Sequence, residues 1–410
     1  MRALKILILP VLILASCAAA QTLRPNHWLM DDVDYHWNRG RMWNVSSLSG
    51  PLTIQQLSDS LQRLDQPGML SKFAAPAHQS GSPFIWLQLD NALRAKDGAQ
   101  DFHSVQRAGA GMWLHPQVQI FGSFNIDNQL DADSSYLGER QSGYAAFMEQ
   151  AYIRGQWHRF AVSFGRDYLS WGPGVDASLH LSDVARPMDH LSLSWNSKYI
   201  SLFYFTAGLD QTEFNVDEAP HRQHRYVSGH RIEVRPAYYL RLGLSETALF
   251  GPDKGVDFAL VNPLLFYTGV EQNGPQSANV MASLDATLLL RRTVSLYFSF
   301  LIDDFQFESK SVDDRGEPAA YGVLSGFNWA DPFGANGVDI FSEYTRVTNR
   351  TYNGQGGPWE KYLHRNRPIG HFLGNDVDRA IIGMRYRKSA KLWLRARYEF
   401  RRRGEGRIEN

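Results

Sequence analysis

Residues 392–400 read LWLRARYEF, and this stretch decides the fold of the chain. One side of the extended backbone carries apolar residues and the other carries mainly arginine. The apolar side consists of Leu392, Leu394, Ala396, Tyr398 and Phe400. Alternation with a period of two is typical of a β-strand with one apolar and one polar face. The same pattern recurs along most of the chain, for example at residues 160–165, 240–245, 295–302 and 382–387.

A membrane can be crossed only by helices or by closed barrels, because every backbone polar group must be satisfied inside lipid. Nothing after the first 20 residues is apolar and long enough to be a spanning helix. The alternation therefore predicts an all-β protein, an antiparallel β-barrel in the outer membrane of a Gram-negative-type bacterium. Spanning strands of about 9–11 residues, with their turns, predict about 16–18 strands.

The composition agrees with a barrel and argues against two other classes. Lys plus Arg and Asp plus Glu both number 42, so the basic excess typical of a nucleic-acid-binding protein is missing. Aromatic residues make up 13% of the chain, which fits the aromatic girdles of a barrel. A mean hydropathy of −0.35 is too polar for a bundle of membrane helices. A barrel tolerates it, because only half of its strand residues face lipid.

The first 20 residues have the layout of a secretory signal peptide. Arg2 and Lys5 precede an apolar run, residues 6–15, that is too short to span a bilayer. Two cleavage sites compete, one after Ala20 and a lipobox-like one before Cys17. We expect cleavage after Ala20, because a barrel requires no lipid anchor, and an acylated Cys17 would contradict this expectation.

The remaining chain divides into three parts. Residues 21–83 are predicted to form a periplasmic or plug segment with short helices, since Thr53 can cap a helix whose leucines follow at helical spacing. Residues 84–403 are predicted to form the transmembrane barrel. Residues 404–410 form a polar tail after Phe400, which we interpret as a short overhang past the last strand.

Arginine is frequent on the polar side of several predicted strands, where side chains face the lumen of a barrel. The lumen-facing candidates are Arg241, Arg385, Arg387, Arg395 and Arg397. They permit two interpretations. The lumen is filled by salt bridges to acidic residues, or its wall binds and passes anions, for which the planar guanidinium group is well suited.

Residues 165–174, with the sequence GRDYLSWGPG, form the most distinctive segment. Its glycines and Pro173 predict a compact bend at the end of a strand. It is either a loop folded inward that constricts the barrel or a platform on which Tyr168 and Trp171 stack against sugar rings. The segment alone does not distinguish the two.

Catalytic and metal-binding patterns are weak. Asp303 and Asp304 are paired carboxylates, but neighbours on a strand point to opposite faces and do not share one substrate. His364, His371, Asp376 and Asp378 are spaced too loosely to specify a metal site. The sequence contains neither a nucleophile elbow nor a phosphate-binding glycine loop. We therefore predict no catalytic residue, no metal and no cofactor.

Several separated groups of residues stand out by their order along the chain. They are Gly165-Arg166 with Trp171-Gly172-Pro173-Gly174 and Leu181-Ser182; Asn262-Pro263 with Tyr267; Asp303-Asp304-Phe305; Glu343-Tyr344-Thr345-Arg346; and Gly370-His371 with Gly374, Asp376 and Asp378. Together with Gly40 and the helix-like residues 51–61, this ordered set resembles the Wzi family of outer-membrane capsule-assembly proteins along most of the chain.

The resemblance implies a barrel of about 18 strands with a small periplasmic helical bundle and helices that plug the lumen. It also implies a lectin-like, non-enzymatic role in holding capsular or extracellular polysaccharide. Outer-membrane lipid and polysaccharide export machinery are the other partners it implies. The candidates for contact with polysaccharide are Arg166, Tyr168, Trp171, Asp303, Glu343, Tyr344, Arg346, His371 and Asp376.

Two alternatives remain open from the sequence. The lumen arginines would also suit a porin or a substrate-specific channel for anionic solutes. An outer-membrane hydrolase would require a nucleophile aligned with a base and an orienting partner. No serine or histidine of the chain lies in a motif that supports it.

Overall fold

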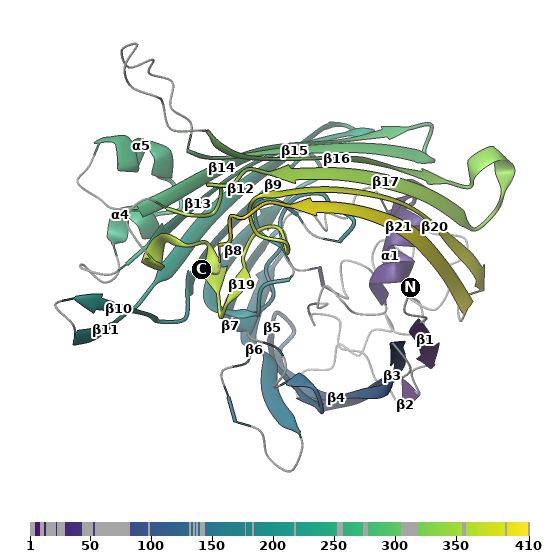
Figure 1. Ribbon diagram of the computed structural model, residues 1–410, viewed down its shortest axis with the longest axis horizontal. Coiled ribbons are helices and arrows are strands. Elements are labelled where there is room, and N and C mark those ends of the chain that lie inside the picture. The colour runs from purple at the N-terminus through teal and green to yellow at the C-terminus, as the bar shows by residue number, and fades with distance from the viewer. Residues whose placement is uncertain are drawn as a thin grey trace.

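The structure is a computed structural model that describes residues 29–42, 83–96, 99–130, 144–176, 178–182, 184–216, 219–251, 257–273, 278–304, 319–354, 358–389 and 392–408. It also describes short pieces and single residues between 5 and 53 and between 133 and 139. Most of these residues belong to one antiparallel sheet of 15 consecutive strands. Figure 1 shows the sheet curling from its C-terminal strands round to its N-terminal ones.

Each strand of this sheet pairs with the strand that follows it, so the order in the sheet is the order in the chain. The strands are β3 (Pro83–Lys96), β4 (Ala99–His115), β5 (Val118–Asp127), β6 (Ala145–Trp157), β7 (Phe160–Asp167), β8 (Met188–Asn196), β9 (Ile200–Gly208), β12 (Tyr226–Ala237), β13 (Leu240–Phe250), β14 (Ala278–Leu290), β15 (Val294–Asp304), β16 (Ala320–Ala330), β17 (Val338–Val347), β20 (Val377–Ser389) and β21 (Leu392–Arg403).

Smaller elements lie in the connections. Two hairpins lie in the loop-end connections, β10 (Thr212–Val216) with β11 (Ala219–Gln223) and β18 (Leu363–His364) with β19 (Arg367–Pro368). The helical elements are α1 (Leu29–Trp37), α4 (Phe258–Val261), α5 (Tyr267–Asn273) and the 3-10 turns Pro332–Gly334 and Pro358–Glu360. Among the described residues, no helix combines the length and apolarity that crossing a membrane takes.

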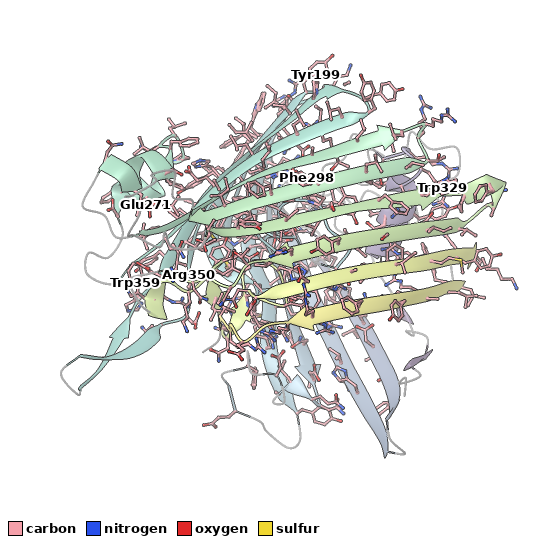
Figure 2. All side chains as sticks on the ribbon, turned by 45° about the horizontal axis from the view of Figure 1, so that its top comes forward. Tyr199, Glu271, Phe298, Trp329, Arg350 and Trp359 are labelled. Carbon is pink, nitrogen blue, oxygen red and sulfur yellow. The ribbon has the colours of Figure 1, made fainter. Side chains whose placement is uncertain are left out.

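Over much of its height the sheet is apolar outside and polar inside, as the alternation predicts, whereas the inner side chains near the loop end are apolar. On β15, Leu296 and Phe298 are 40% and 43% exposed on the convex face, whereas Ser295 and Ser299 are only 2% and 4% exposed (Figure 2). A soluble protein places its apolar side chains inside. The reverse arrangement is that of a sheet whose outer face contacts lipid.

The connections differ in length at the two ends of the sheet. At one end the turns are short, such as residues 116–117, 158–159 and 238–239, and at the other the connections are long, such as 168–187, 251–277 and 348–376. In Figure 2, Trp329 marks the turn end, while Glu271 and Trp359 mark the loop end. Because outer-membrane barrels have short periplasmic turns and longer external loops, the loop end faces the outside of the cell.

Helix α1 lies on the inner side of the sheet at the turn end (Figure 1). Arg39, just after the helix, forms ion pairs with Asp331 at 2.7 Å and with Asp339 at 2.9 Å. Thr53 pairs with Thr22 through an isolated β-bridge. The rest of the second predicted helix lies outside the described residues.

We expect Arg39→Ala to weaken the attachment of α1 to the wall, because Asp339 is 2% exposed and loses a charged donor. The free energy of unfolding should fall by about 1.5–3 kcal/mol, the usual loss for hydrogen bonds to charged groups. Hydrogen exchange of residues 29–42 measures the weakening. Arg41→Ala, at an exposed position two residues on, is the control and should leave the exchange unchanged.

The two edge strands of the sheet, β3 and β21, have different partners. The outer edge of β3 pairs with β1 (Lys5–Ile8) and β2 (Leu12–Ile13), both within the predicted signal peptide. Among the described strands, β21 pairs with β20 alone. After β21, residues 404–408 fold over the loop end, where Ile408 is fully buried against the apolar cluster that contains Leu373.

Candidate functional site

The segment between β7 and β8 folds into the interior of the sheet at the loop end. Trp171 is 1% exposed, and its ring packs edge-on against Phe205 of β9 with a centroid separation of 5.2 Å. Gly229 of β12 permits this approach, since a Cβ atom there would lie 2.7 Å from the indole ring. The buried cluster extends to Leu179, Leu181 and many wall residues. The interior at this level is therefore an apolar core rather than an open channel.

His180 fixes the deepest part of this segment to the wall. One ring nitrogen lies 2.6 Å from the Ser283 hydroxyl on β14, and the other lies 2.9 Å from the Thr247 hydroxyl on β13. Burial, reinforced by the positive charge of Arg231, lowers the pKa of His180 to about 3. The imidazole is therefore neutral at physiological pH and anchors the segment to the wall through its two hydrogen bonds.

All five arginines predicted to face the lumen lie on the inner side of the sheet and contact segments that fill it. The contacts are Arg241 with the Trp37 ring (5.6 Å), Arg385 with Asp34 (3.6 Å), Arg387 with the Tyr35 ring (4.4 Å), Arg395 with Asp31 (2.6 Å) and Arg397 with Asp176 (2.6 Å). Four of the five partners belong to α1. These contacts favour the interpretation of a lumen filled by ion pairs.

Arg379 of β20 is the centre of a large ion-pair cluster at the inner wall. It is 1% exposed and binds Asp176 of the inserted segment, Glu399 at 3.1 Å and Glu343 at 3.5 Å. The charge of Arg379, helped by Arg397, lowers the pKa of Asp176 although burial opposes this. The cluster thus links the inserted segment to three strands.

Three of the predicted polysaccharide contacts project from the outer face of the sheet, close to the loop end. Arg166 pairs with Asp189 at 2.6 Å, Tyr344 donates to Asp378 at 2.9 Å, and Arg346 lies 3.9 Å from the same carboxylate. Tyr344 is 42% exposed. Because alternate residues of a strand face opposite sides, these side chains lie at the rim that borders the membrane, away from the lumen.

Five further candidates are held within the protein. Trp171 and His371 are 1% and 0% exposed, so neither offers a ring face to a sugar, which corrects the expectation of a stacking platform at Trp171. The carboxylates accept backbone hydrogen bonds: Asp303 from Tyr352 N (2.5 Å), Glu343 from Val175 N (2.7 Å), and the half-buried Asp376 from Gly406 N (2.8 Å). These groups organise the loops.

The loop end also carries a basic surface that the sequence did not reveal. Asp133 is bound by Arg186, at 2.9 Å, and by Arg367, and it is 22% exposed. Arg365 and the half-buried Tyr168 lie close enough to act on the charge of Arg186. We name Tyr168, Arg186, Arg365 and Arg367 the loop-end arginine surface. Its members come from two loops that are far apart in the sequence.

A tight turn presents two of these arginines. Arg365 and Asn366 have φ values of 49° and 59°, the left-handed pair of a two-residue hairpin turn between β18 and β19. Arg-Asn-Arg at residues 365–367 was the one available signal, since asparagine favours such turns. It indicates a hairpin, but no sequence pattern indicates that Arg186 lies beside it.

Asp210 holds this hairpin to the connection after β9. Its carboxylate accepts from Arg225 at 2.9 Å and from the Arg365 backbone N at 2.9 Å, and it lies 3.3 Å from His364. Burial alone would raise the pKa of Asp210. The hydrogen bond with His364 and the charge of Arg225 outweigh burial and lower the pKa to about 2.

Acid should therefore release the hairpin. A carboxylate whose pKa is near 3.9 when unfolded and about 2 when folded contributes stability above about pH 4. This contribution, on the order of 2 kcal/mol, is lost as the pH falls from about 4 to about 2. Hydrogen exchange of residues 363–368 measures it. Asp210→Asn should raise exchange at neutral pH, whereas Asp331→Asn at the turn end should not.

The chain matches one protein family and resembles a solved outer-membrane barrel structure. The family model described as capsule assembly protein Wzi matches residues 100–409. The solved structure of Wzi from Escherichia coli, described as an outer membrane protein involved in group 1 capsule assembly and a carbohydrate-binding β-barrel, has a TM-score of 0.63 at 16% identity, covering 94% of this chain and 86% of that one. No curated protein sequence matches the chain.

Porin structures resemble the chain more weakly. Pseudomonas aeruginosa OccK10 (OpdN) has a TM-score of 0.40 at 13% identity, covering 80% of this chain and 86% of that one. A mutant of the Rh. blastica porin has a TM-score of 0.38 at 10% identity, covering 74% of this chain and 87% of that one.

Proposed function

Because the chain belongs to the Wzi family of capsule assembly proteins, we propose that it holds capsular or other extracellular polysaccharide at the cell surface. It is an outer-membrane protein with the barrel fold of E. coli Wzi. In this proposal, the polymer arrives from polysaccharide export machinery and is retained by the external loops. The barrel wall is embedded in outer-membrane lipid.

The observation that carries this proposal is the loop-end arginine surface. The guanidinium groups of Arg186 and Arg367 both bind the carboxylate of Asp133, and Arg365 lies close enough to act on the charge of Arg186. Arginine pairs with carboxylates through two parallel hydrogen bonds. Tyr168 adds an aromatic ring beside them. A surface with this excess of positive charge suits a polysaccharide that contains acidic sugars.

The proposed role is non-enzymatic and does not include transport through the lumen. Asp303 and Glu343 are predicted contact residues on the inner face of the sheet. Their carboxylates accept hydrogen bonds from backbone amides of the loops. The apolar cluster around Trp171 fills the interior. Conductance in a planar bilayer tests the alternative of an anion channel. A large and stable current through the unmodified protein would favour the channel.

Binding of purified protein to a uronic-acid-containing capsular polysaccharide tests the proposal, with neutral dextran as the reference polymer. We expect binding to the acidic polymer that weakens as salt is raised. The double variant Arg365→Ala/Arg367→Ala should bind at least about tenfold more weakly, the equivalent of 1.4 kcal/mol.

Arg346→Ala is the matched control, since it removes an arginine from the outer rim near the same end of the sheet. It should bind as the unmodified protein does. Equal binding of acidic and neutral polymers, or unchanged binding by the double variant, would show that the loop-end arginine surface does not bind the polysaccharide. Loss of capsule from a deletion strain measures the wider role in the cell.

A further inference from the structure

The outer face of the sheet carries a cavity beneath the connection between β13 and β14. Its volume is about 470 Å³. Its floor is formed by outward-facing side chains of β8, β9, β12 and β13, among them Leu193, Leu202, Ile232 and Leu244. Its lid is the segment Pro263–Phe266, which joins α4 to α5. Figure 1 shows both helices outside the sheet at the loop end.

The lid is fixed to the wall by hydrogen bonds. The Glu246 carboxylate on β13 accepts from the backbone amides of Tyr267 at 2.8 Å and Thr268 at 2.7 Å, which are the first residues of α5. His230 on β12 pairs with the same carboxylate at 3.1 Å. The Tyr204 hydroxyl on β9 donates to the Val261 carbonyl of α4. The cavity is thus bounded by a rigid lid.

The lid and the adjacent helix α4 also expose apolar side chains. Phe258, Leu264 and Phe266 are 86%, 90% and 60% exposed. Groups this apolar gain from contact with hydrocarbon rather than water. On the floor, Ile232 and Leu244 are 45% and 44% exposed and continue the lipid-facing rows of β12 and β13. The cavity is therefore a recess of the surface that already faces the membrane.

We propose that this cavity binds one acyl chain of an outer-leaflet lipid, held between the α4–α5 segment and the barrel wall. Three observations support this occupant. The lining is almost entirely apolar, the cavity opens onto the lipid-facing rows, and the lid lies at the loop end, where the outer leaflet meets the sheet. A polar ligand would leave its hydrogen-bonding groups unsatisfied there.

Photo-crosslinking tests the proposal with phosphatidylcholine that carries a diazirine in its acyl chain, incorporated in nanodiscs with the full chain. Labelled peptides are identified by mass spectrometry. We expect the label on residues 263–266 to exceed that on Leu296 and Phe298 at least fivefold, since those β15 residues face lipid without a lid. Equal labelling of the two sites would overturn the proposal.

A matched pair of variants tests occupancy directly. Ala282 lines the cavity, and Ala286 lies on the same strand and face, half-buried, outside it. Ala282→Trp fills the cavity and should abolish the excess label, whereas Ala286→Trp should preserve it. Excess label that persists in Ala282→Trp contradicts the proposal. If Ala282→Trp does not fold, the comparison of label on residues 263–266 with label on Leu296 and Phe298 in the unmodified protein still tests the proposal.

Discussion

Trp171→Ala opens the interior of the sheet to ions and lowers the free energy of unfolding by about 3–5 kcal/mol, the usual cost of truncating a buried tryptophan. The indole is 1% exposed, packs on Phe203 and Phe205, and is the largest side chain of the inserted segment. Its removal leaves a void at the level where the lumen is sealed. The segment then loses much of the apolar contact that holds it inside.

Planar-bilayer conductance and urea unfolding from lipid vesicles measure the two effects. The unmodified protein should give a closed trace, and Trp171→Ala should give frequent openings. Trp329→Ala is the matched control, because Trp329 lies at the turn end and packs on Phe333 outside the inserted segment. A closed trace from Trp171→Ala, with normal folding, would show that another segment seals the lumen.

Arg379→Met is expected to destabilise the protein by about 3–5 kcal/mol, the usual cost of breaking a buried ion pair from one side. Methionine keeps the length of the side chain but leaves Asp176, Glu343 and Glu399 without their shared cation. The unpaired negative charge costs most at Glu343, because this side chain is buried and only 2% exposed. Thermal melting in detergent, followed by β-type circular dichroism, measures the loss.

Arg395→Met makes the same chemical change on the neighbouring strand. The ion pair of Arg395 with Asp31 is exposed, 53% and 44% for the two side chains, so its loss should cost less than about 1 kcal/mol. The double variant Arg379→Met/Glu343→Gln should recover part of the stability, because it removes one uncompensated buried charge. Equal melting of Arg379→Met and Arg395→Met would contradict the cluster's proposed importance.

The fold followed from the sequence because strand alternation is a local property. The pattern at residues 392–400 needs no knowledge of distant residues, and β21 occupies Leu392–Arg403. The same period assigns Glu343 to the inner face and Tyr344 and Arg346 to the outer face. The sequence could therefore have separated these three candidates, although their resemblance to a family motif grouped them together.

The interior and the external surface could not be derived in this way. Whether Trp171 lies on a surface or in the lumen depends on where its loop folds, and the tryptophan has the same local pattern in both cases. Arg186 and Arg367 meet on Asp133 although they lie on different loops. Non-local pairings of this kind leave no periodic signal in a single sequence.

The odd number of consecutive strands has a consequence for how the cylinder is sealed. With 15 antiparallel strands, β3 and β21 both run from the turn end to the loop end, so joining them directly would make a parallel seam. An antiparallel seam needs an odd number of additional strands. β1 and β2 occupy the edge of β3 with the required polarity. Cleavage after Ala20 would vacate that position, and maturation would then have to supply a different strand to complete the circumference.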